Sequence, residues 1–154
     1  MPSDTGKETQ ARDAVFRLLK YRPRSENEIR DKLKTQQFSS DMIESTVRFF
    51  KERDFINDRL FARGWIASRL NRPLGLKRIR YELIQKGIDR NIIKEELDEA
   101  SAQYCEEEAV FDLARKRMRK YTHLDEEKAK KRLIGYLGRR GFDAGTIFKV
   151  AGKL

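Results

Sequence analysis

The chain has 154 residues and a formal net charge of +10, which predicts an anionic partner such as nucleic acid, an acidic protein face or anionic lipid. Charged residues (39%) match apolar residues (38%), and this balance favours a thin assembly of helices over a globule with one large core. No window holds about 18 consecutive apolar residues, so the sequence predicts no membrane-spanning helix. The single cysteine, Cys105, excludes an internal disulfide and fits a reducing cytoplasm.

The first elements are predicted from their start and stop signals. Residues 1–10 are polar and lack an apolar signal core, so they are expected to form a disordered tail. An apolar stripe then predicts a helix over about 11–20, which ends before Pro23 because the residue preceding proline disfavours helix. Ser25 and Glu28 have the spacing of a capping box and begin the second helix.

One helix–helix corner occurs three times. Ser39, Asp89 and Asp143 are expected N-caps, and each lies between two apolar residues at the spacing of a hydrophobic staple. The staple pairs are Phe38 with Ile43, Ile88 with Ile93, and Phe142 with Ile147. Gly87 and Gly141 precede two of these corners, where a left-handed helix end favours glycine. Gln37 occupies the third position, so that turn is expected to be looser or closed differently.

These matches recur at constant offsets of fifty and fifty-four residues, which is the signature of an internal repeat. The expected units are residues 11–56, 57–104 and 105–154, each containing three helices. Asn57 is expected to cap the first helix of the second unit. A longer linker at 120–124 accounts for the four extra residues of the third unit. The sequence therefore predicts an all-α fold in which three three-helix repeats form an elongated, curved array. Since a unit of this size buries only a marginal core, packing between neighbours is expected to matter.

The charge is segregated into blocks along the chain. Residues 69–86 contain six bases and one acid, residues 95–112 contain eight acids and no base, and residues 115–141 contain eleven bases and three acids. A single exposed Lys or Arg is usually just solvated, but like charges at this density repel one another. The two basic blocks therefore predict contacts with an anionic partner.

Two helices joined by a tight turn resemble a helix-turn-helix, whose second helix reads bases in the major groove. The corresponding helix of the second repeat carries four carboxylates at positions 95–99, so groove insertion by this helix is rejected. Lys77, Tyr81 and Gln85 share a face away from the apolar stripe. Lys77, Arg78 and Arg72 are expected to contact phosphates without reading the base sequence. Tyr81 is placed to stack on a base, although an exposed tyrosine on a helix is more often inert. The candidate partner- or DNA-binding residues are Arg69, Arg72, Lys77, Arg78, Tyr81, Lys86, Arg115, Lys116, Arg119, Lys120, Lys131, Arg132, Arg139 and Arg140.

The sequence contains no pattern that predicts catalysis. It has neither a glycine-rich phosphate loop nor a dinucleotide-binding fingerprint. His123 has no partner motif for a metal, and Cys105 has no neighbouring histidine or cysteine motif. The three glutamates at 106–108 point to different sides of a helix and suit its N-terminal dipole. We therefore interpret the chain as a non-enzyme without cofactor or metal.

The first repeat contains Arg22-Pro23-Arg24-Ser25-Glu26-x2-Ile29-Arg30-x2-Leu33. The second contains Asp58-x2-Phe61-Ala62-Arg63, Ile66-Ala67-Ser68-Arg69 and Ile79-Arg80-x-Glu82-Leu83-x2-Lys86-Gly87-Ile88, and the third contains Tyr136-Leu137-x-Arg139-Arg140-Gly141-Phe142. These segments, in order and at the right spacing, resemble the RecX family, regulators of the bacterial RecA recombinase. The resemblance implies a curved array that lies along the RecA filament on DNA and restrains its growth, strand exchange, ATPase and co-protease activities. It also implies DNA binding and no catalytic centre. Where family members usually have Gly-Pro, this chain has Arg72-Pro73-Leu74-Gly75.

The leading hypothesis is thus a cytoplasmic, monomeric modulator of RecA. It would meet the filament, and single- or double-stranded DNA phosphates, through basic faces of the second and third repeats. One alternative is a sequence-independent nucleic-acid-binding module that acts without RecA. Another is a helical scaffold for a different acidic protein.

Overall fold

The computed structural model describes residues 3–154, and this part of the chain is helical without any β-strand. The first repeat contains α1 (Asp4–Tyr21), α2 (Glu26–Thr35) and α3 (Ser40–Glu52). The second contains α4 (Asp58–Leu70), α5 (Leu76–Gln85) and α6 (Arg90–Ser101). The third contains α7 (Glu106–Met118), the short 3₁₀ helix η1 (Arg119–Tyr121), α8 (Glu126–Arg139) and α9 (Ala144–Ala151).

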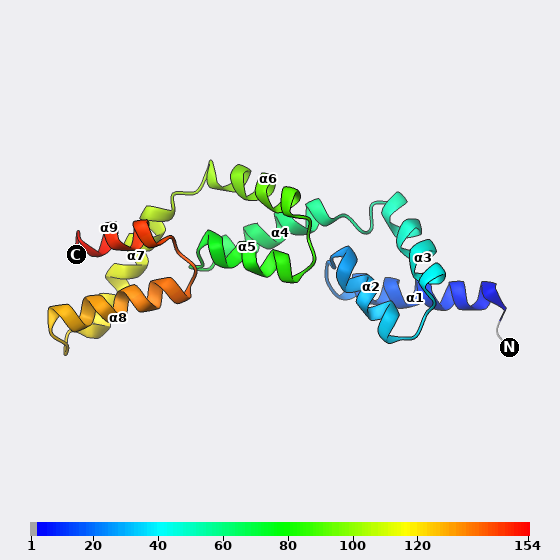
Figure 1. Ribbon diagram of the computed structural model, residues 1–154, viewed down its shortest axis with the longest axis horizontal. Helices are drawn as coiled ribbons and strands as arrows, with labels where there is room; N and C mark the ends of the chain where they lie inside the picture. Colours follow the sequence, from blue (N-terminus) through cyan, green and yellow to red (C-terminus); the bar gives the residue numbers. More distant parts are fainter. Residues whose placement is uncertain (1–2) are drawn as a thin grey trace.

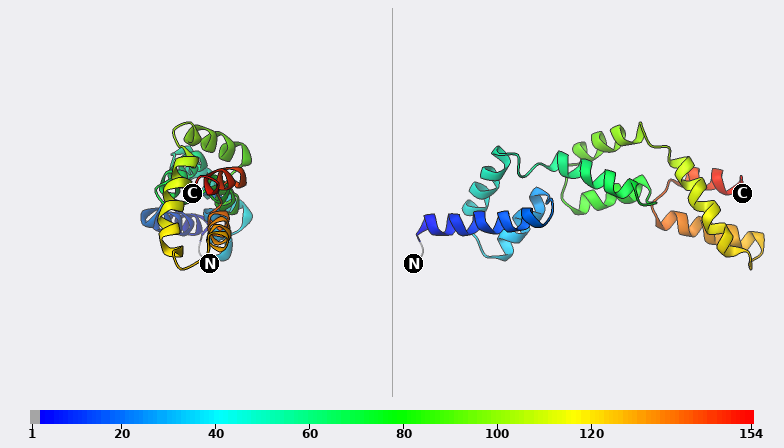
Figure 2. Two further views of the ribbon diagram at one scale, coloured as in Figure 1. Left: turned by 90° about the vertical axis from the view of Figure 1, so that its left-hand side faces the viewer. Right: turned by 180° about the vertical axis from the view of Figure 1, so that it is seen from behind.

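The three repeats lie in a row and form an elongated array, which confirms the predicted all-α repeat architecture (Figure 1). The array is narrow when viewed along its length (Figure 2). Each repeat has its own apolar core: one is built around Phe50 and Leu33, the next around Ile79 and Leu83, and the last around Leu133 and Leu137. The helices pack mainly within their own repeat, so no single hydrophobic core runs along the molecule.

The predicted disordered tail at 1–10 is wrong for residues 4–10, which form the first turns of α1; residues 1 and 2 lie outside the described part. The side-chain oxygen of Ser3 accepts a hydrogen bond from the backbone N–H of Gly6 and caps this helix. Asp4 lies in the first turn, where its negative charge suits the helix dipole, and Glu8 pairs with Arg12 one turn later. These local interactions stabilise the polar first turns of α1, which precede the apolar stripe of this helix.

All three predicted corners form, and Ser39, Asp89 and Asp143 cap the third helix of each repeat. The expectation that Gln37 closes its turn differently is wrong. Gln37 has φ of 66°, close to Gly87 (75°) and Gly141 (82°). In each corner the next backbone N–H also returns to a carbonyl five residues earlier, as in a Schellman motif. Gln37 therefore adopts the left-handed conformation that glycine adopts in the other repeats, at a steric cost of about 1–2 kcal/mol.

The second helices α8, α5 and α2 follow one another end to end and form a spine along the array (Figure 1). At each joint, the N-terminus of one helix meets the C-terminus of the helix from the next repeat. The Ser25 hydroxyl donates to the carbonyl oxygen of Lys86 at 2.7 Å, and the backbone N–H of Gly75 donates to the carbonyl oxygen of Arg140 at 2.8 Å. Opposite ends of the helix dipoles thus face each other, which is the favourable arrangement.

This end-to-end contact explains where glycine is needed. A Cβ at Gly87 would lie 2.5 Å from the Cβ of Asn27, and a Cβ at Gly141 would lie 2.4 Å from the Cβ of Arg78. α2 is the last helix of the spine (Figure 1), and Gln37, which follows its C-terminal end in the sequence, is exposed. The joints therefore favour glycine for close approach as well as for backbone conformation, whereas the turn at Gln37 favours it for backbone conformation alone.

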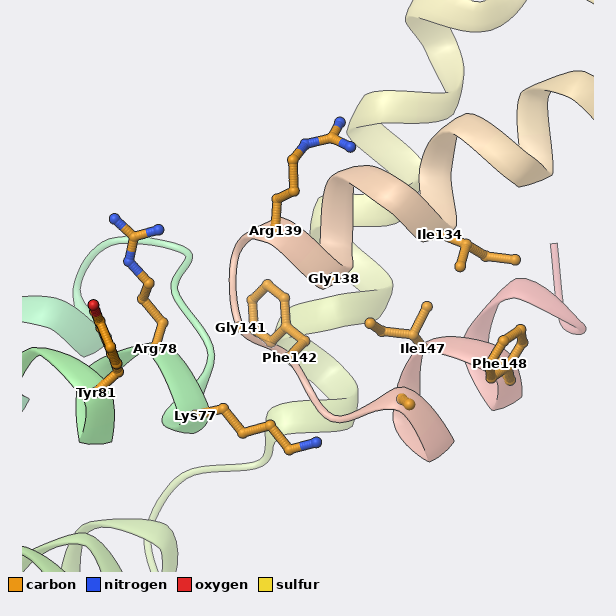
Figure 3. Close-up of a pocket in the computed structure, with 11 residues that line it drawn as sticks. Lys77, Arg78, Tyr81, Ile134, Gly138, Arg139, Gly141, Phe142, Ile147 and Phe148 are labelled. Carbon is orange, nitrogen blue, oxygen red and sulfur yellow. The ribbon is translucent and has the colours of Figure 1, made fainter.

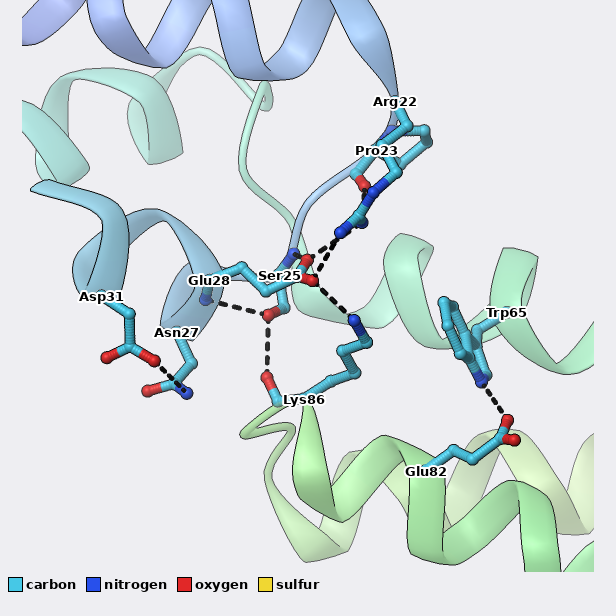
Figure 4. A network of polar contacts seen from close by, with 9 residues as sticks. All are labelled: Arg22, Pro23, Ser25, Asn27, Glu28, Asp31, Trp65, Glu82 and Lys86. Carbon is cyan, nitrogen blue, oxygen red and sulfur yellow. Dashed lines mark hydrogen bonds and ion pairs between the residues drawn. The ribbon is translucent and has the colours of Figure 1, made fainter. Parts of the chain in front are cut away.

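A polar network also crosses the joint between the first two repeats (Figure 4). The Glu28 carboxylate accepts hydrogen bonds from the Arg22 guanidinium (2.8 Å), the Lys86 ammonium (2.7 Å) and the Ser25 backbone N–H (3.0 Å). The last of these belongs to the predicted capping box, which is present. Nearby, the backbone N–H of Glu26 donates to Asp58 at the start of α4. Packing between neighbours therefore does occur, but hydrogen bonds and an ion pair carry it rather than apolar area.

Burial alone would raise the pKa of Glu28, but the hydrogen bonds from Arg22, Lys86 and Ser25 outweigh it and lower the pKa from 4.5 to about 2. A carboxyl with a depressed pKa in the folded state contributes stability above its unfolded pKa. This contribution is therefore complete above about pH 4.5 and is lost as the pH falls toward 2.

We expect Gln37→Gly to stabilise the protein by about 1 kcal/mol, because glycine adopts positive φ without steric cost. Thermal unfolding followed by circular dichroism should show a melting temperature higher by a few degrees. Gln36→Gly is the matched control, since Gln36 has φ of −80° and glycine there adds only flexibility to the unfolded chain. An equal rise in both variants would contradict the assignment of strain to Gln37.

We expect Glu28→Gln to lower the free energy of unfolding at neutral pH and to flatten its decline between pH 4.5 and 2. The difference in free energy of unfolding between wild type and variant should shrink by roughly 3 kcal/mol as the pH falls from 4.5 to 2. Urea unfolding at a series of pH values measures it. Glu127→Gln removes an exposed glutamate on α8 that forms no ion pair within residues 3–154, and its difference from wild type should stay constant. A parallel pH profile for Glu28→Gln would show that the network adds no pH-dependent stability.

Candidate functional site

Three of the predicted binding residues are used inside the fold. Lys86 pairs with Glu28 across the first joint, as described above. Arg69 on α4 donates to Glu82 on α5 at 2.8 Å and lies over the ring of Trp65, whose indole N–H donates to the same carboxylate. The guanidinium of Arg140 donates to the Pro73 carbonyl oxygen at 3.0 Å and so crosses the second joint. These cations stabilise the array. Carboxylates partly neutralise Lys86 and Arg69, and a backbone carbonyl oxygen accepts a hydrogen bond from Arg140.

Several carboxylates of the acidic residues 95–112 also form ion pairs within the fold. Glu96 on α6 is only 3% exposed and accepts hydrogen bonds from Arg63 (2.9 Å) and Arg59 (3.0 Å) on α4. The hydrogen bond from Arg63 is the largest of the effects that lower the pKa of Glu96. Glu107 on α7 pairs with Lys149 and Lys153 in the last repeat. The most buried carboxylate of α6 therefore faces α4 and is not presented to solvent.

The first groove lies at the joint between the second and third repeats (Figure 3). It is open and has a volume of about 560 Å³. Lys77, Arg78 and Tyr81 project from α5 on one side, and Arg139 projects from the end of α8. The remaining lining comes from the third repeat and is mostly apolar: Ile134, Gly138, Gly141, Phe142, Ala144, Ile147 and Phe148. Four of the predicted binding residues are thus brought together around an apolar floor.

The cations of this groove are weakly paired. Lys77 lies 3.7 Å from the Asp143 carboxylate, with both side chains more than half exposed. Arg78 approaches Glu82 at 3.5 Å, a carboxylate that already pairs with Arg69. Exposed pairs at such distances contribute little, so these charges remain available to a partner.

The second groove lies between α7 and α8 and shares Arg139 with the first. Its lining consists of Arg117, Tyr121, Lys131, Arg132, Gly135 and Arg139. Arg117 donates to the Tyr121 hydroxyl at 3.0 Å, and its guanidinium lies 4.3 Å from the ring centre of Tyr136. These contacts hold one cation in place beside two exposed ones, Lys131 and Arg132.

The other predicted residues lie outside both grooves. Arg115, Lys116, Arg119 and Lys120 are exposed on the last turn of α7 and on η1, and Arg72 is exposed in the loop before α5. Four residues that line the grooves were not predicted from the sequence: Arg117, Tyr121, Ile134 and Phe148. Of these, only Phe148 could have been noticed in the sequence, because it is a large aromatic residue outside the stapled pattern of the last helix. In the structure it is 61% exposed.

Within residues 3–154, no cluster of His, Cys, Asp and Glu side chains has the arrangement of a metal site. None of the helices in this range has the length and apolar character needed to cross a membrane.

Comparison with known proteins matches each repeat separately. Residues 11–50, 57–97 and 106–151 match the family models of the first, second and third three-helix domains of RecX, respectively. The chain is 37% identical over 142 residues to the regulatory protein RecX of Chlorobium phaeobacteroides, covering 90% of this chain and 89% of that protein. It is 37% identical over 145 residues to the RecX protein of Prosthecochloris aestuarii, covering 91% and 92%. The crystal structure of RecX from Lactobacillus salivarius superposes with a TM-score of 0.83 at 26% identity, covering 96% of both chains.

Proposed function

The chain belongs to the RecX family of regulatory proteins, and on that premise we propose that it modulates the RecA recombinase by binding the RecA–DNA filament. Binding restrains filament growth and, with it, the ATPase, strand-exchange and co-protease activities of RecA. The protein acts by occupying the filament as a monomer, without a catalytic step of its own.

The observation that supports this proposal is the placement of weakly paired cations along an elongated array. The first and second grooves adjoin at Arg139 and together span α5, α7 and α8. Neither groove has an acidic residue in its lining. An elongated molecule with two adjoining grooves that both carry cations suits an extended anionic polymer better than a small ligand.

The direct test measures the DNA-dependent ATPase of RecA and sedimentation of the chain with RecA–DNA filaments. We expect the protein to cosediment with filaments and to lower the steady-state ATPase at equimolar amounts. If the chain neither changes the ATPase nor cosediments, the proposal is wrong.

The exposed cations of the first groove should carry part of this binding. We expect Lys77→Glu combined with Arg139→Glu to weaken filament binding by at least about tenfold, since like charges would then face an anionic partner. Titration of labelled protein with preassembled filaments measures the affinity. The control is Arg90→Glu with Lys94→Glu on α6, which changes the net charge equally outside both grooves. Equal losses in the two variants would show that only overall charge matters.

The second candidate function is sequence-independent nucleic-acid binding without RecA. The pairing of cations with Tyr81 in one groove and Tyr121 in the other favours it, because basic grooves with aromatic side chains bind single strands. In that case affinity for bare DNA should equal or exceed affinity for the filament. The logarithm of this affinity should also fall linearly with the logarithm of the salt concentration. The slope should be about 0.7 for each phosphate contacted on single strands and about 0.9 on duplex.

A further inference from the structure

The two grooves share Arg139 but differ in their chemistry. The first has cations at its rim and an apolar floor, to which Ile134, Phe142, Ile147 and Phe148 contribute. The second is lined by four cations, one tyrosine and one glycine, and has no aliphatic floor. A phosphate chain gains nothing from an apolar floor, whereas an apolar side chain buried there gains about 25 cal/mol for each Å² removed from water.

The first groove also exposes large side chains that do not belong to the apolar core of either repeat. Phe148 on α9 is 61% exposed and Tyr81 on α5 is 60% exposed, and both line this groove. The neighbouring residue Val150, by contrast, is buried in the core of the third repeat and does not line the groove. Exposed apolar groups gathered in one concave site mark an interaction surface more often than scattered ones do.

Charge determines which apolar partner fits. Lys77, Arg78 and Arg139 stand around the floor, and Arg139 forms no ion pair within residues 3–154. A segment with an apolar side chain between acidic residues would bury the former on the floor and place the latter against these cations. A wholly apolar segment would leave the cations beside a dry surface, which is unfavourable.

We propose that the first groove binds an acidic peptide segment of a partner protein, with an aliphatic or aromatic side chain inserted beside Phe148. DNA phosphates are then left to the second groove, where Arg117, Lys131 and Arg132 stand around Gly135. This inference rests on the proposed function, because it assigns the protein and the DNA of the filament to separate grooves.

Phe148→Ser tests the assignment, since the side chain is exposed and its loss removes no core contact. We expect this variant to bind RecA–DNA filaments at least about tenfold more weakly, as is usual for an anchor at an interface, while its affinity for a bare single-stranded oligonucleotide changes less than about twofold. Lys131→Glu with Arg132→Glu should weaken binding to the bare oligonucleotide by about tenfold or more. Fluorescence anisotropy of a labelled oligonucleotide, free or coated with RecA, measures both affinities.

Two further variants guard against indirect effects. Leu60→Ser removes an apolar side chain of similar exposure on α4, outside both grooves, and should leave both affinities unchanged. Phe148→Leu keeps an apolar anchor and should restore most of the filament affinity. Circular dichroism of each variant verifies that the helices are intact.

The outcomes separate this inference from the proposed function. If the wild-type chain does not bind the filament, the proposed function fails. If the wild type binds but Phe148→Ser binds equally well, the peptide groove is wrong and the proposed function stands. If Phe148→Ser weakens binding to the bare oligonucleotide as much as to the filament, the groove stacks bases and the inference is overturned.

Discussion

The architecture depends on one contact, in which the N-terminus of a second helix is placed directly against the C-terminus of the second helix in the next repeat. Only glycine allows this approach, because a Cβ at Gly87 or Gly141 would overlap the neighbouring helix. The carbonyl oxygens of Lys86 and Arg140 then accept hydrogen bonds across the joints. Since each apolar core is confined to its own repeat, these small polar joints set how the repeats are arranged. The first groove exists because the second joint brings α5 against the end of α8.

Local signals in the sequence were sufficient to predict the helices and corners. A cap, a staple and a glycine act within one turn of chain, so they keep their meaning wherever the repeat is placed. Two predictions failed for the same kind of reason. The polar composition of residues 4–10 concealed a helix stabilised by a cap and an ion pair, and Gln37 adopts a conformation that its residue type disfavours. In both cases short-range geometry outweighed the average tendency of the residues involved.

The sequence was sufficient to predict which cations form the site, but not how they are arranged or which of them are paired within the fold. Composition along the chain shows that bases are clustered, yet it does not show which of them find acids far away in the sequence. Lys86 meets Glu28 fifty-eight residues earlier, and Arg140 reaches the Pro73 carbonyl oxygen sixty-seven residues earlier. Such pairs form only once the joints are made. The apolar floor was missed for a related reason, because Phe148 belongs to α9 and lines a groove together with residues of α5 and α8 only in the folded chain.

The two joints differ at several equivalent positions, and one of these differences contributes to the charge of the groove. Glu28 in the first repeat corresponds to Arg78 in the second, at the repeat offset of fifty residues. At the first joint, the carboxylate of Glu28 neutralises the lysine at the end of the next helix, and the interface is closed by an ion pair. At the second joint the equivalent of Glu28 is itself a base, Arg78, and Arg140 donates to the Pro73 carbonyl oxygen. Lys77 and Arg78 at the second joint form only long, largely exposed pairs with Asp143 and Glu82, so their charges remain available to a partner. A contact that is structural at the first joint thus becomes part of a binding surface at the second.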